Sequence, residues 1–260
     1  MSRTPQAGTD PLPRSGPPGS TAVVVLAGGS GSRVGATQNK VYLPLAGRRV
    51  ISWSFTWAAE VAGVGHLVLV VRPQDAELAE RTLRREAPVG PPVELVIGGD
   101  TRHGSEQAAL DHLAPRVRSG QVDVIVIHDG ARPLAGPALF GSVIAAAAEA
   151  GGAIPALPAQ GVLPAAGLPA DAGRAAAGPE SAGLARVQTP QAFRAGPLLH
   201  AYERARAEGY QGTDTASSIE RYGEAVVRVV TGSRHNLKVT YPRDLVLAER
   251  LLALNQYRMP

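Results

Sequence analysis

The chain has 260 residues, of which 44% are hydrophobic and 18% charged, a globular mixture long enough for one sizeable domain or two small ones. It contains no cysteine, which excludes a disulfide framework and a thiolate metal site, and no apolar run approaches the roughly 18–20 residues that a membrane span needs. The net charge of +4 suits an anionic small molecule, whereas scattered basic residues without interleaved aromatic side chains argue against a nucleic-acid surface.

Residues 1–20 are rich in proline, glycine and serine and carry almost nothing apolar, which predicts a disordered tail. This tail lacks the apolar core of a secretory signal peptide. Together with the missing cysteines and membrane spans, it predicts a soluble protein located in the cytoplasm.

Beyond the tail, strand and helix patterns alternate along one domain, residues 21–258. Short continuous apolar runs, typical of parallel strands buried on both faces, predict strands over residues 21–27, 66–71, 93–99 and 122–130. The segments between them predict helices over residues 50–62, 74–87, 105–117 (helical as far as Pro115) and 137–150. This alternation predicts an open, mostly parallel α/β sheet with helices on both faces.

Residues 153–187 interrupt the alternation, because they are crowded with alanine, glycine and proline and show poor hydrophobic periodicity. We predict that this segment leaves the sheet as a projecting arm. The regular pattern then returns, and it predicts helices over residues 196–209, 214–223 and 241–254 and a strand over residues 225–232. Asp214 stands where its side chain would cap the second helix of this part.

The stretch LAGGSGSRVGATQNKVYLPL, residues 26–45, follows the first strand and is the first candidate binding loop. Without Cβ atoms, Gly28, Gly29 and Gly31 let backbone N–H groups point at phosphate oxygens. Arg33 and Lys40 follow them and could neutralise a polyphosphate. No G-K-[ST] follows the glycines, so the loop is not a Walker A motif. A plain strand-to-helix turn is the alternative, and it explains the glycines but not the two cations.

Lysine is rare in this chain, since Lys40 and Lys238 are the only lysines among 26 basic residues. A compact ammonium group and a planar guanidinium are not interchangeable near a phosphate. The two lysines are therefore candidates for anion contacts, although drift in an arginine-rich sequence would give the same pattern.

Two further loops stand at predicted carboxyl ends of strands, where open α/β sheets bind their ligands. In VIGGDTRHGS, Asp100 and Ser105 could read a base edge through hydrogen bonds, unless Ser105 only caps the following helix. In IHDGARP, Asp129 is a hard oxygen ligand suited to Mg²⁺, and Arg132 offers a fork for a second anion. Asp129 could instead close a turn or cap a helix, and His128 is expected to have a structural role.

These residues combine glycine loops, two lysines, arginines and one carboxylate suited to a metal. The sequence shows no Ser/His/Asp set, no cysteine nucleophile and no pair of carboxylates placed as acid and base. This chemistry supports nucleotidyl or phosphoryl transfer, which depends on positioning and charge neutralisation more than on covalent catalysis.

The motifs LAGGSGSRVG…NKVYLPL, GGDTRHGS, HDGARP, VQTPQAF, TDTAS and NLKVT resemble, in this order, those of the 2-C-methyl-D-erythritol 4-phosphate cytidylyltransferase family of the non-mevalonate isoprenoid pathway. The resemblance covers roughly residues 21–256, and the polyol-phosphate cytidylyltransferases share the layout. It implies a Rossmann-like nucleotidyltransferase that transfers CMP from CTP to the sugar phosphate with Mg²⁺. It also implies a homodimer, with the arm as the dimerisation element, and no nucleic-acid or membrane partner.

The resemblance assigns roles to individual residues. Arg33, Lys40 and Lys238 would be catalytic, the first two by stabilising charge at the α-phosphate, and Asp129 would position Mg²⁺. The residues that would bind the nucleotide are Ala27, Gly28, Gly29, Gly31, Gly99, Asp100, Ser105 and Gly130. Those that would hold the acceptor phosphate are Arg132, Thr189 and Lys238.

The chain departs from the family pattern in the arm, which in the family reaches across a homodimer and helps hold the acceptor in the partner's site. Pro158 and Ala159 stand where the family usually carries an Asp-Thr pair, and Ser181 stands where it carries an arginine. Arg174 and Arg186 lie nearby in the sequence and are candidates to substitute for these polar residues.

Three other functions compete with this one. The acceptor could be another polyol phosphate such as ribitol 5-phosphate, or the chain could be a nucleotide-binding paralogue with weak or no catalysis. An NAD-dependent oxidoreductase is disfavoured, because the second strand ends in VVRPQD with no carboxylate at its tip for a ribose, and no Tyr-x-x-x-Lys pair follows.

Overall fold

The computed structural model describes residues 21–29, 39–159, 185–212, 214–222 and 225–256. The strands of its main sheet are β1 (Thr21–Leu26), β4 (Val64–Val71), β5 (Val93–Ile97), β6 (Val124–Asp129), β7 (Gly151–Pro158), β8 (Ala185–Val187), β9 (Gln191–Arg194) and β10 (Val226–Thr231). They lie in the order β10-β7-β9-β6-β1-β4-β5, and β8 pairs with β7 outside this path. A small separate hairpin joins β2 (Pro44–Leu45) to β3 (Arg48–Arg49).

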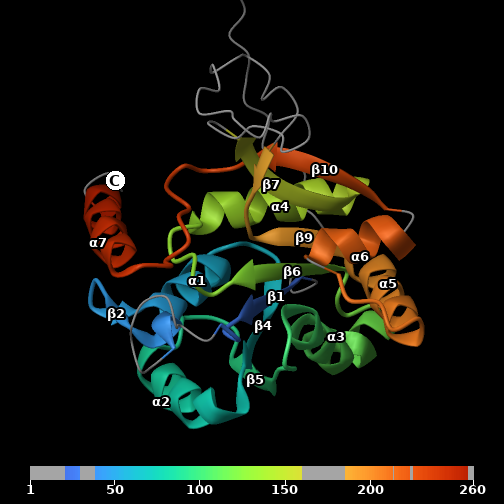
Figure 1. Ribbon diagram of the computed structural model, residues 1–260, viewed down its shortest axis with the longest axis horizontal. Helices are drawn as coiled ribbons and strands as arrows, with labels where there is room; N and C mark the ends of the chain where they lie inside the picture. Colours follow the sequence, from blue (N-terminus) through green and yellow to red (C-terminus); the bar gives the residue numbers. More distant parts are fainter. Residues whose placement is uncertain (1–20, 30–38, 160–184, 213, 223–224, 257–260) are drawn as a thin grey trace, which may run out of the picture.

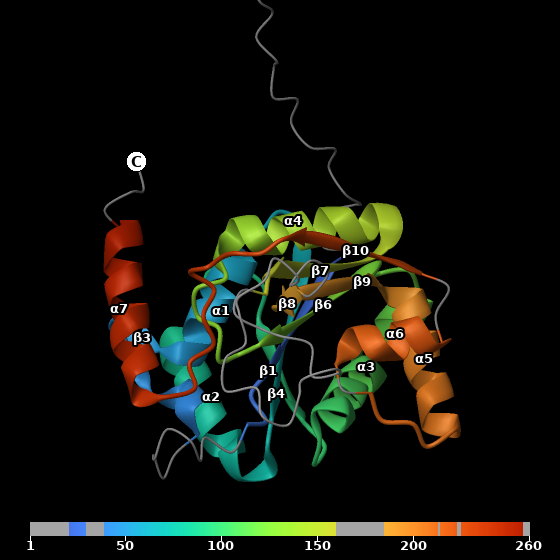
Figure 2. The same ribbon diagram turned by 45° about the horizontal axis from the view of Figure 1, so that its top comes forward.

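The main helices are α1 (Val50–Ala59), α2 (Ala76–Glu86), α3 (Arg102–Arg118), α4 (Gly136–Ala150), α5 (Ala195–Ala207), α6 (Thr215–Tyr222) and α7 (Pro242–Gln256). Two short 3-10 helices, η2 (Lys40–Tyr42) and η3 (Pro73–Asp75), precede α1 and α2. Helices α1, α2 and α4 pack on one face of the sheet, and α3, α5 and α6 pack on the other, as Figure 2 shows. The predicted open, mostly parallel sheet covered on both faces is confirmed.

The alternating side chains of β1 explain why its sequence is apolar throughout. Val23 and Val25 join the core under α1 and α4, whereas Val24 and Leu26 join the core under α3 and α5. All six residues of the strand are buried. A parallel strand with helices above and below it has no face for polar side chains, which is why such strands read as continuous apolar runs.

Two strands on one side of the sheet correct the prediction for residues 153–187. The segment does not leave the sheet at residue 153, because β7 carries the main sheet as far as Pro158 and pairs in parallel with β10. Glycine is uncommon in strands, so the glycines at the start of β7 obscured its strand pattern in the sequence. They allow close packing, because a Cβ at Gly152 would lie 2.9 Å from the ring of Phe193. Phe193 belongs to β9, a short strand that was not predicted and runs antiparallel to both β6 and β7.

Helix α3 also differs from its predicted range. It begins three residues early, because the Thr101 hydroxyl accepts a hydrogen bond from the Gly104 N–H (3.0 Å) and caps the first turn. Ser105 therefore lies inside the helix and does not cap it. The helix also runs through Pro115 and ends at Arg118. By contrast, the predicted cap of α6 is confirmed, since Asp214 accepts a hydrogen bond from the Ser217 N–H (2.9 Å).

Helix α7 closes the described chain beside the β2–β3 hairpin (Figure 1). Its Ala248 and Leu252 pack with Leu45 and Trp53 in a small cluster of their own. Among the described helices, none is long and apolar enough to cross a membrane.

The register of the central strands places their carboxyl ends side by side. Leu26, the last residue of β1, pairs with Asp129, the last residue of β6. On its other side, Leu26 pairs with Val70 near the end of β4. Ligands of open α/β sheets bind beyond these ends, so the loops after β1, β5 and β6 meet where a site is expected.

Candidate active site

A cavity of about 290 Å³ lies at the carboxyl ends of β1, β5 and β6. It is lined by Leu26, Gly28, Gly29, Lys40, Val41, Gly99, Asp100, Thr101, Arg102, Ser105, Asp129, Ala131 and Lys238. Most predicted nucleotide and catalytic residues within the described ranges thus line a single cavity.

The loop between β5 and α3 is packed tightly against the first turn of α3. The Ser105 hydroxyl donates a hydrogen bond to the Gly99 carbonyl oxygen (3.2 Å). A Cβ at Gly98 would lie 2.7 Å from that hydroxyl oxygen, and one at Gly99 would lie 3.0 Å from the backbone of Gly104. The glycine pair therefore lets the loop approach α3, whose N-terminal turn faces the cavity with the positive end of its dipole.

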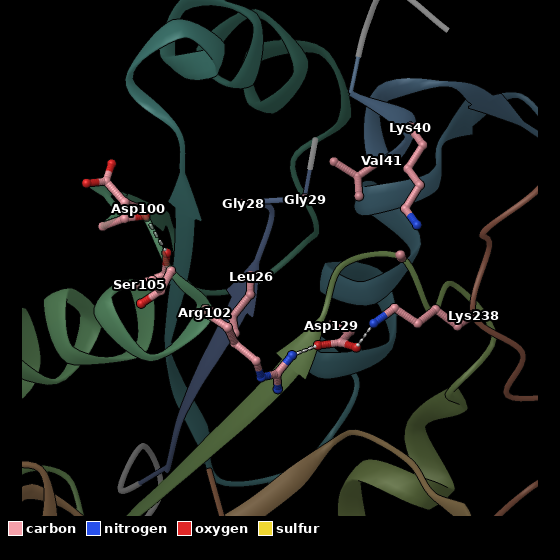
Figure 3. A pocket seen from close by; sticks show the side chains of 13 residues that line it. Leu26, Gly28, Gly29, Lys40, Val41, Asp100, Arg102, Ser105, Asp129 and Lys238 are labelled. Carbon is pink, nitrogen blue, oxygen red and sulfur yellow. Dashed lines mark hydrogen bonds and ion pairs between the residues drawn. The ribbon is translucent and has the colours of Figure 1, made fainter. Parts of the chain in front are cut away.

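Asp129 lies between two cations at the base of the cavity (Figure 3). Its Oδ2 accepts a hydrogen bond from the Lys238 ammonium group (2.7 Å), and its Oδ1 accepts one from Arg102. Burial alone would raise the pKa of Asp129, but the charges of Arg102 and Lys238 outweigh burial and hold the pKa well below its usual range. Asp129 is therefore an ionised carboxylate.

Arg102 also forms an ion pair with the buried carboxylate of Glu106. Its Nε lies 3.0 Å from Glu106 Oε1, and Glu106 also accepts hydrogen bonds from the hydroxyls of Tyr202 and Thr215, the latter at 2.9 Å. Burial raises the pKa of Glu106, and the neighbouring Arg102 charge opposes that rise. The network fixes the guanidinium that contacts Asp129.

The backbone of Asp129 is fixed by a chain of hydrogen bonds on the other side. The Asp129 N–H donates to Thr189 Oγ1 (3.0 Å), and Thr189 Oγ1 lies 3.3 Å from His128 Nδ1. His128 Nε2 lies 3.1 Å from the Arg132 carbonyl oxygen and donates to it in the neutral ring. His128 has the structural role expected of it, because burial lowers its pKa to about 4 and keeps the ring neutral near pH 7.

This histidine predicts a pH dependence of stability. The unfolded chain protonates His128 near its ordinary pKa of 6.5, whereas the folded protein resists protonation until about pH 4, so stability falls as the pH falls between these values. We expect the free energy of unfolding to drop by up to about 3 kcal/mol over that range. Urea denaturation from pH 7 to 4 measures the drop, and His128→Gln should flatten the profile.

The matched control for this measurement is His235→Gln, which removes an exposed imidazole and leaves the buried one in place. Equal slopes for His128→Gln and the wild-type protein would contradict the prediction.

Lys40 enters the cavity from η2, and its ammonium group points toward the Asp129–Lys238 pair (Figure 3). The preceding residue, Asn39, fixes this turn. Its Nδ2 donates to the Ala27 carbonyl oxygen (2.7 Å) and to Asp75 Oδ2 (3.0 Å), and its Oδ1 accepts from the Val41 N–H (3.4 Å). Asn39 thus ties the lysine to the end of β1.

We expect Asn39→Ala to lower the free energy of unfolding by about 2–3 kcal/mol, since the substitution removes three buried hydrogen bonds worth about 1 kcal/mol each. The rate of the nucleotidyl transfer that the sequence predicts should fall as well, because Lys40 is no longer anchored. Urea denaturation and a pyrophosphate assay check both effects. Asn39→Asp is the second test variant: it keeps the side-chain volume but places a carboxylate beside Asp75, so it should also be less stable than wild type. Wild-type stability in either variant would contradict the prediction.

A second cavity, of about 580 Å³, adjoins the first and shares Lys238 with it. It is lined by Arg132, Leu157, Pro158, Arg186, Gln188, Arg234, Asn236, Leu237 and Lys238. Arg132 and Lys238, two of the three residues predicted to bind the acceptor, thus lie in one wall.

The remaining predicted residues lie elsewhere. Gly31 and Arg33 fall outside the described residues. Ala27, Gly130 and Thr189 do not line either cavity. Ala27 accepts the bond from Asn39, and Gly130 packs so closely that a Cβ would lie 2.3 Å from Ile51 Cδ1.

Arg102 and Asn39 orient charged groups of the site but were not predicted. Arg102 carries no usable signal while the helix is predicted to begin at residue 105; the structure shows it at the first position of α3, where the helix dipole opposes a cation unless an anionic partner is present. Asn39 carries none, since its side chain joins segments from distant parts of the sequence.

A family model described as 2-C-methyl-D-erythritol 4-phosphate cytidylyltransferase matches residues 21–254. The chain belongs to this family. The resemblance noted in the sequence is thereby confirmed, and the Rossmann-like nucleotidyltransferase fold with it.

Individual relatives cover nearly the whole chain. A 2-C-methyl-D-erythritol 4-phosphate cytidylyltransferase of Cereibacter sphaeroides is 39% identical over 234 residues, covering 90% of this chain and 97% of the relative. One from Synechococcus is 35% identical, covering 88% of this chain and 96% of the relative. The crystal structure of 4-diphosphocytidyl-2C-methyl-D-erythritol synthase from Anaerococcus prevotii superposes with a TM-score of 0.72 at 25% sequence identity. The match covers 90% of this chain and 96% of that one. Membership of the cytidylyltransferase family makes the cavity at Asp129 the candidate site of nucleotidyl transfer.

Proposed function

We propose that this chain transfers CMP from CTP to 2-C-methyl-D-erythritol 4-phosphate, giving 4-diphosphocytidyl-2-C-methyl-D-erythritol and pyrophosphate. The observation that carries the proposal is the Asp129 carboxylate, held between Arg102 and Lys238 and faced by Lys40 in a cavity with glycine-rich walls. The family membership and the names of the relatives support the same reaction.

The first cavity would bind the nucleotide. Gly28 and Gly29 leave room for phosphate oxygens close to the backbone, and the first turn of α3 offers its dipole. Ser105 and the Gly99 loop lie on the same wall, where they would contact the cytidine. Lys40 would neutralise charge that builds up at the α-phosphate during transfer.

Lys238 borders both cavities, so it would contact the acceptor phosphate and the α-phosphate together. An oxygen of the acceptor phosphate forms a bond to the α-phosphorus. The bond from that phosphorus to the bridging oxygen of the β-phosphate breaks, and pyrophosphate leaves with the electron pair. The protein contributes to such a step mainly through positioning and charge neutralisation.

Mg²⁺ fits Asp129 as its single protein carboxylate. Across the described residues, no cluster of three or more His, Asp or Glu side chains could hold a metal by itself. Mg²⁺ nonetheless binds readily through one or two carboxylates, substrate phosphates and water, and Asp129 is kept ionised by its neighbours. When bound, the ion would neutralise phosphate charge.

The homodimer and the cytoplasmic location stay predictions.

A second candidate acceptor is another polyol phosphate. It is favoured by the apolar Pro158 in the wall of the second cavity, where the family pattern would place a polar residue.

The decisive experiment is pyrophosphate release with CTP and Mg²⁺ against a panel of methylerythritol, ribitol and erythritol phosphates. Turnover with methylerythritol phosphate is expected. Turnover only with a different polyol phosphate would assign the second acceptor, and CTP binding without any turnover would identify a nucleotide-binding paralogue. Omitting Mg²⁺, or adding a chelator, tests the metal.

A further inference from the structure

The second cavity has an unusual balance of charge. Four of its lining side chains are cationic, namely those of Arg132, Arg186, Arg234 and Lys238, and no lining residue is acidic. Lys238 is paired with Asp129, but within the described ranges none of the three arginines forms an ion pair with a carboxylate. Uncompensated cations around one cavity repel each other, and a bound dianion would relieve that repulsion.

Arg132 is aligned for such a ligand. Its Nη1 donates a hydrogen bond to the Asn236 carbonyl oxygen (2.8 Å), which fixes the plane of the guanidinium. Its Nε is buried and has no hydrogen-bond partner among the described residues. A planar guanidinium with unused N–H groups at a cavity wall is suited to phosphate.

The loop that carries Arg234 is built onto the VQTPQ motif. The Gln188 side chain donates to the Ser233 carbonyl oxygen (2.8 Å) and accepts from the Ser233 N–H (3.1 Å). On the other side of Arg234, the Asn236 side chain donates to the Thr189 carbonyl oxygen (2.8 Å). A Cβ at Gly232 would lie 2.6 Å from Gln188 Oε1 and 3.1 Å from the Ala156 carbonyl oxygen, so a side chain there would crowd this contact. Arg234 therefore projects from a fixed backbone.

Arg186 is fixed by the sheet. It lies in β8, where it pairs with Leu157 of β7, and both residues line the second cavity. The sequence already marks Arg186 as a candidate to substitute for the polar residues that the arm lacks, whereas Arg174 lies outside the described residues. The cations of the cavity thus come from β8 and from the loops after β6 and β10 of one chain.

We propose that Arg186 and Arg234 hold the phosphate group of the acceptor, so that the anion-binding wall of the second cavity is complete within a single chain. This inference rests on the proposed function for the identity of the acceptor. Arg132 and Lys238 supply two of the four cations of that wall, and Arg186 and Arg234 supply the other two. Arg186 and Arg234 make a phosphate monoester dianion, rather than a neutral polyol, the ligand class of the cavity.

Steady-state kinetics test the two arginines. In Arg186→Gln and Arg234→Gln, the KM for methylerythritol phosphate should rise about tenfold each, and in the double variant about 100-fold, because each substitution removes a charge-assisted hydrogen bond to the phosphate. The KM for CTP should change less than twofold. Arg118→Gln, an exposed arginine of α3 outside both cavities, is the charge-matched control. A KM for the acceptor within twofold of wild type in the double variant would overturn the proposal.

Titration with inorganic phosphate gives a readout that does not depend on turnover. At constant ionic strength, calorimetry should show at least tenfold weaker phosphate binding in the double variant than in wild type and Arg118→Gln. Equal affinities would overturn the proposal. If wild type turned over no acceptor, the proposed function would fail, yet this titration would still decide whether the cavity binds phosphate through these arginines.

Mixing experiments test whether the wall is built in one chain. The double variant mixed with Lys238→Ala should show no more activity than the sum of its parts, because no single chain then carries all three cations. A gain in activity on mixing would mean that the arginines act in a partner's site, and would overturn this part of the proposal.

Discussion

Replacing Lys40 with alanine is expected to lower the kcat of CMP transfer by about 10²–10³-fold, the usual cost of removing one preorganised electrostatic interaction. The ammonium group points into the cavity toward the Asp129–Lys238 pair, so the effect falls on the step in which charge builds up at the α-phosphate. The Asn39 hydrogen bonds that anchor its turn stay in place in this variant, so the free energy of unfolding should change by less than about 1 kcal/mol. Single-turnover kinetics and urea denaturation measure the two quantities.

Lys40→Arg is the informative control for this prediction. It keeps the charge but replaces a compact ammonium group with a planar fork, so a partial rate would show that geometry matters as well as charge. A sharp drop in the thermal midpoint of Lys40→Ala, with the rate little changed, would instead mark Lys40 as a structural lysine.

Asp129→Asn is expected to affect both stability and activity. At pH 7 it leaves Arg102 and Lys238 facing each other without the anion between them, at a cost of about 2–4 kcal/mol of unfolding free energy, reduced because Lys238 is half exposed. Activity should fall at least 10³-fold, since the substitution removes the carboxylate that we propose binds Mg²⁺, together with the alignment of Lys238.

The pH dependence of this variant follows from the sign of the pKa shift. Because the pKa of Asp129 is held below its unfolded value of about 3.9, the carboxylate stabilises the fold above that pH, and the contribution is lost as the pH falls below it. The stability difference between wild type and Asp129→Asn should therefore be full at pH 7 and shrink below about pH 4. A difference independent of pH would contradict the ion-pair assignment.

The central strands could be predicted because burial on both faces of the sheet selects an apolar residue at nearly every position of the strand. Every position of β1 and β6 is buried, and both runs are apolar except for Thr21, His128 and Asp129. The same reasoning failed for β7, where close packing against Phe193 and Ala225 selects Gly151 and Gly152 in place of β-branched residues. Tertiary packing there produces a strand from residues that have a low local preference for one.

Some residues of the candidate site could likewise be predicted from the sequence, and others could not. Lys40, Asp129 and Lys238 were predictable because their residue types are rare or chemically distinctive at strand ends. The Glu106–Arg102 support and the Asn39 anchor were not, since the hydrogen bonds that fix them join segments far apart in the chain. A sequence pattern records which groups are present at strand ends, whereas the contacts that orient those groups arise only from the fold.

The two cavities are lined by different parts of the sequence, which meet at the peptide bond between Ala131 and Arg132. Apart from Lys238, the first cavity takes its walls from residues 26–131, and the second takes all of its walls from residues 132–238. Changes in the second half can therefore alter the proposed acceptor cavity while the proposed nucleotide cavity keeps its lining, which fits a chain whose nucleotide motifs follow the family pattern and whose arm does not. Under the proposed roles of the two cavities, donor and acceptor recognition share only Lys238 among the described lining residues, so a new acceptor could evolve without any change in the lining of the first cavity.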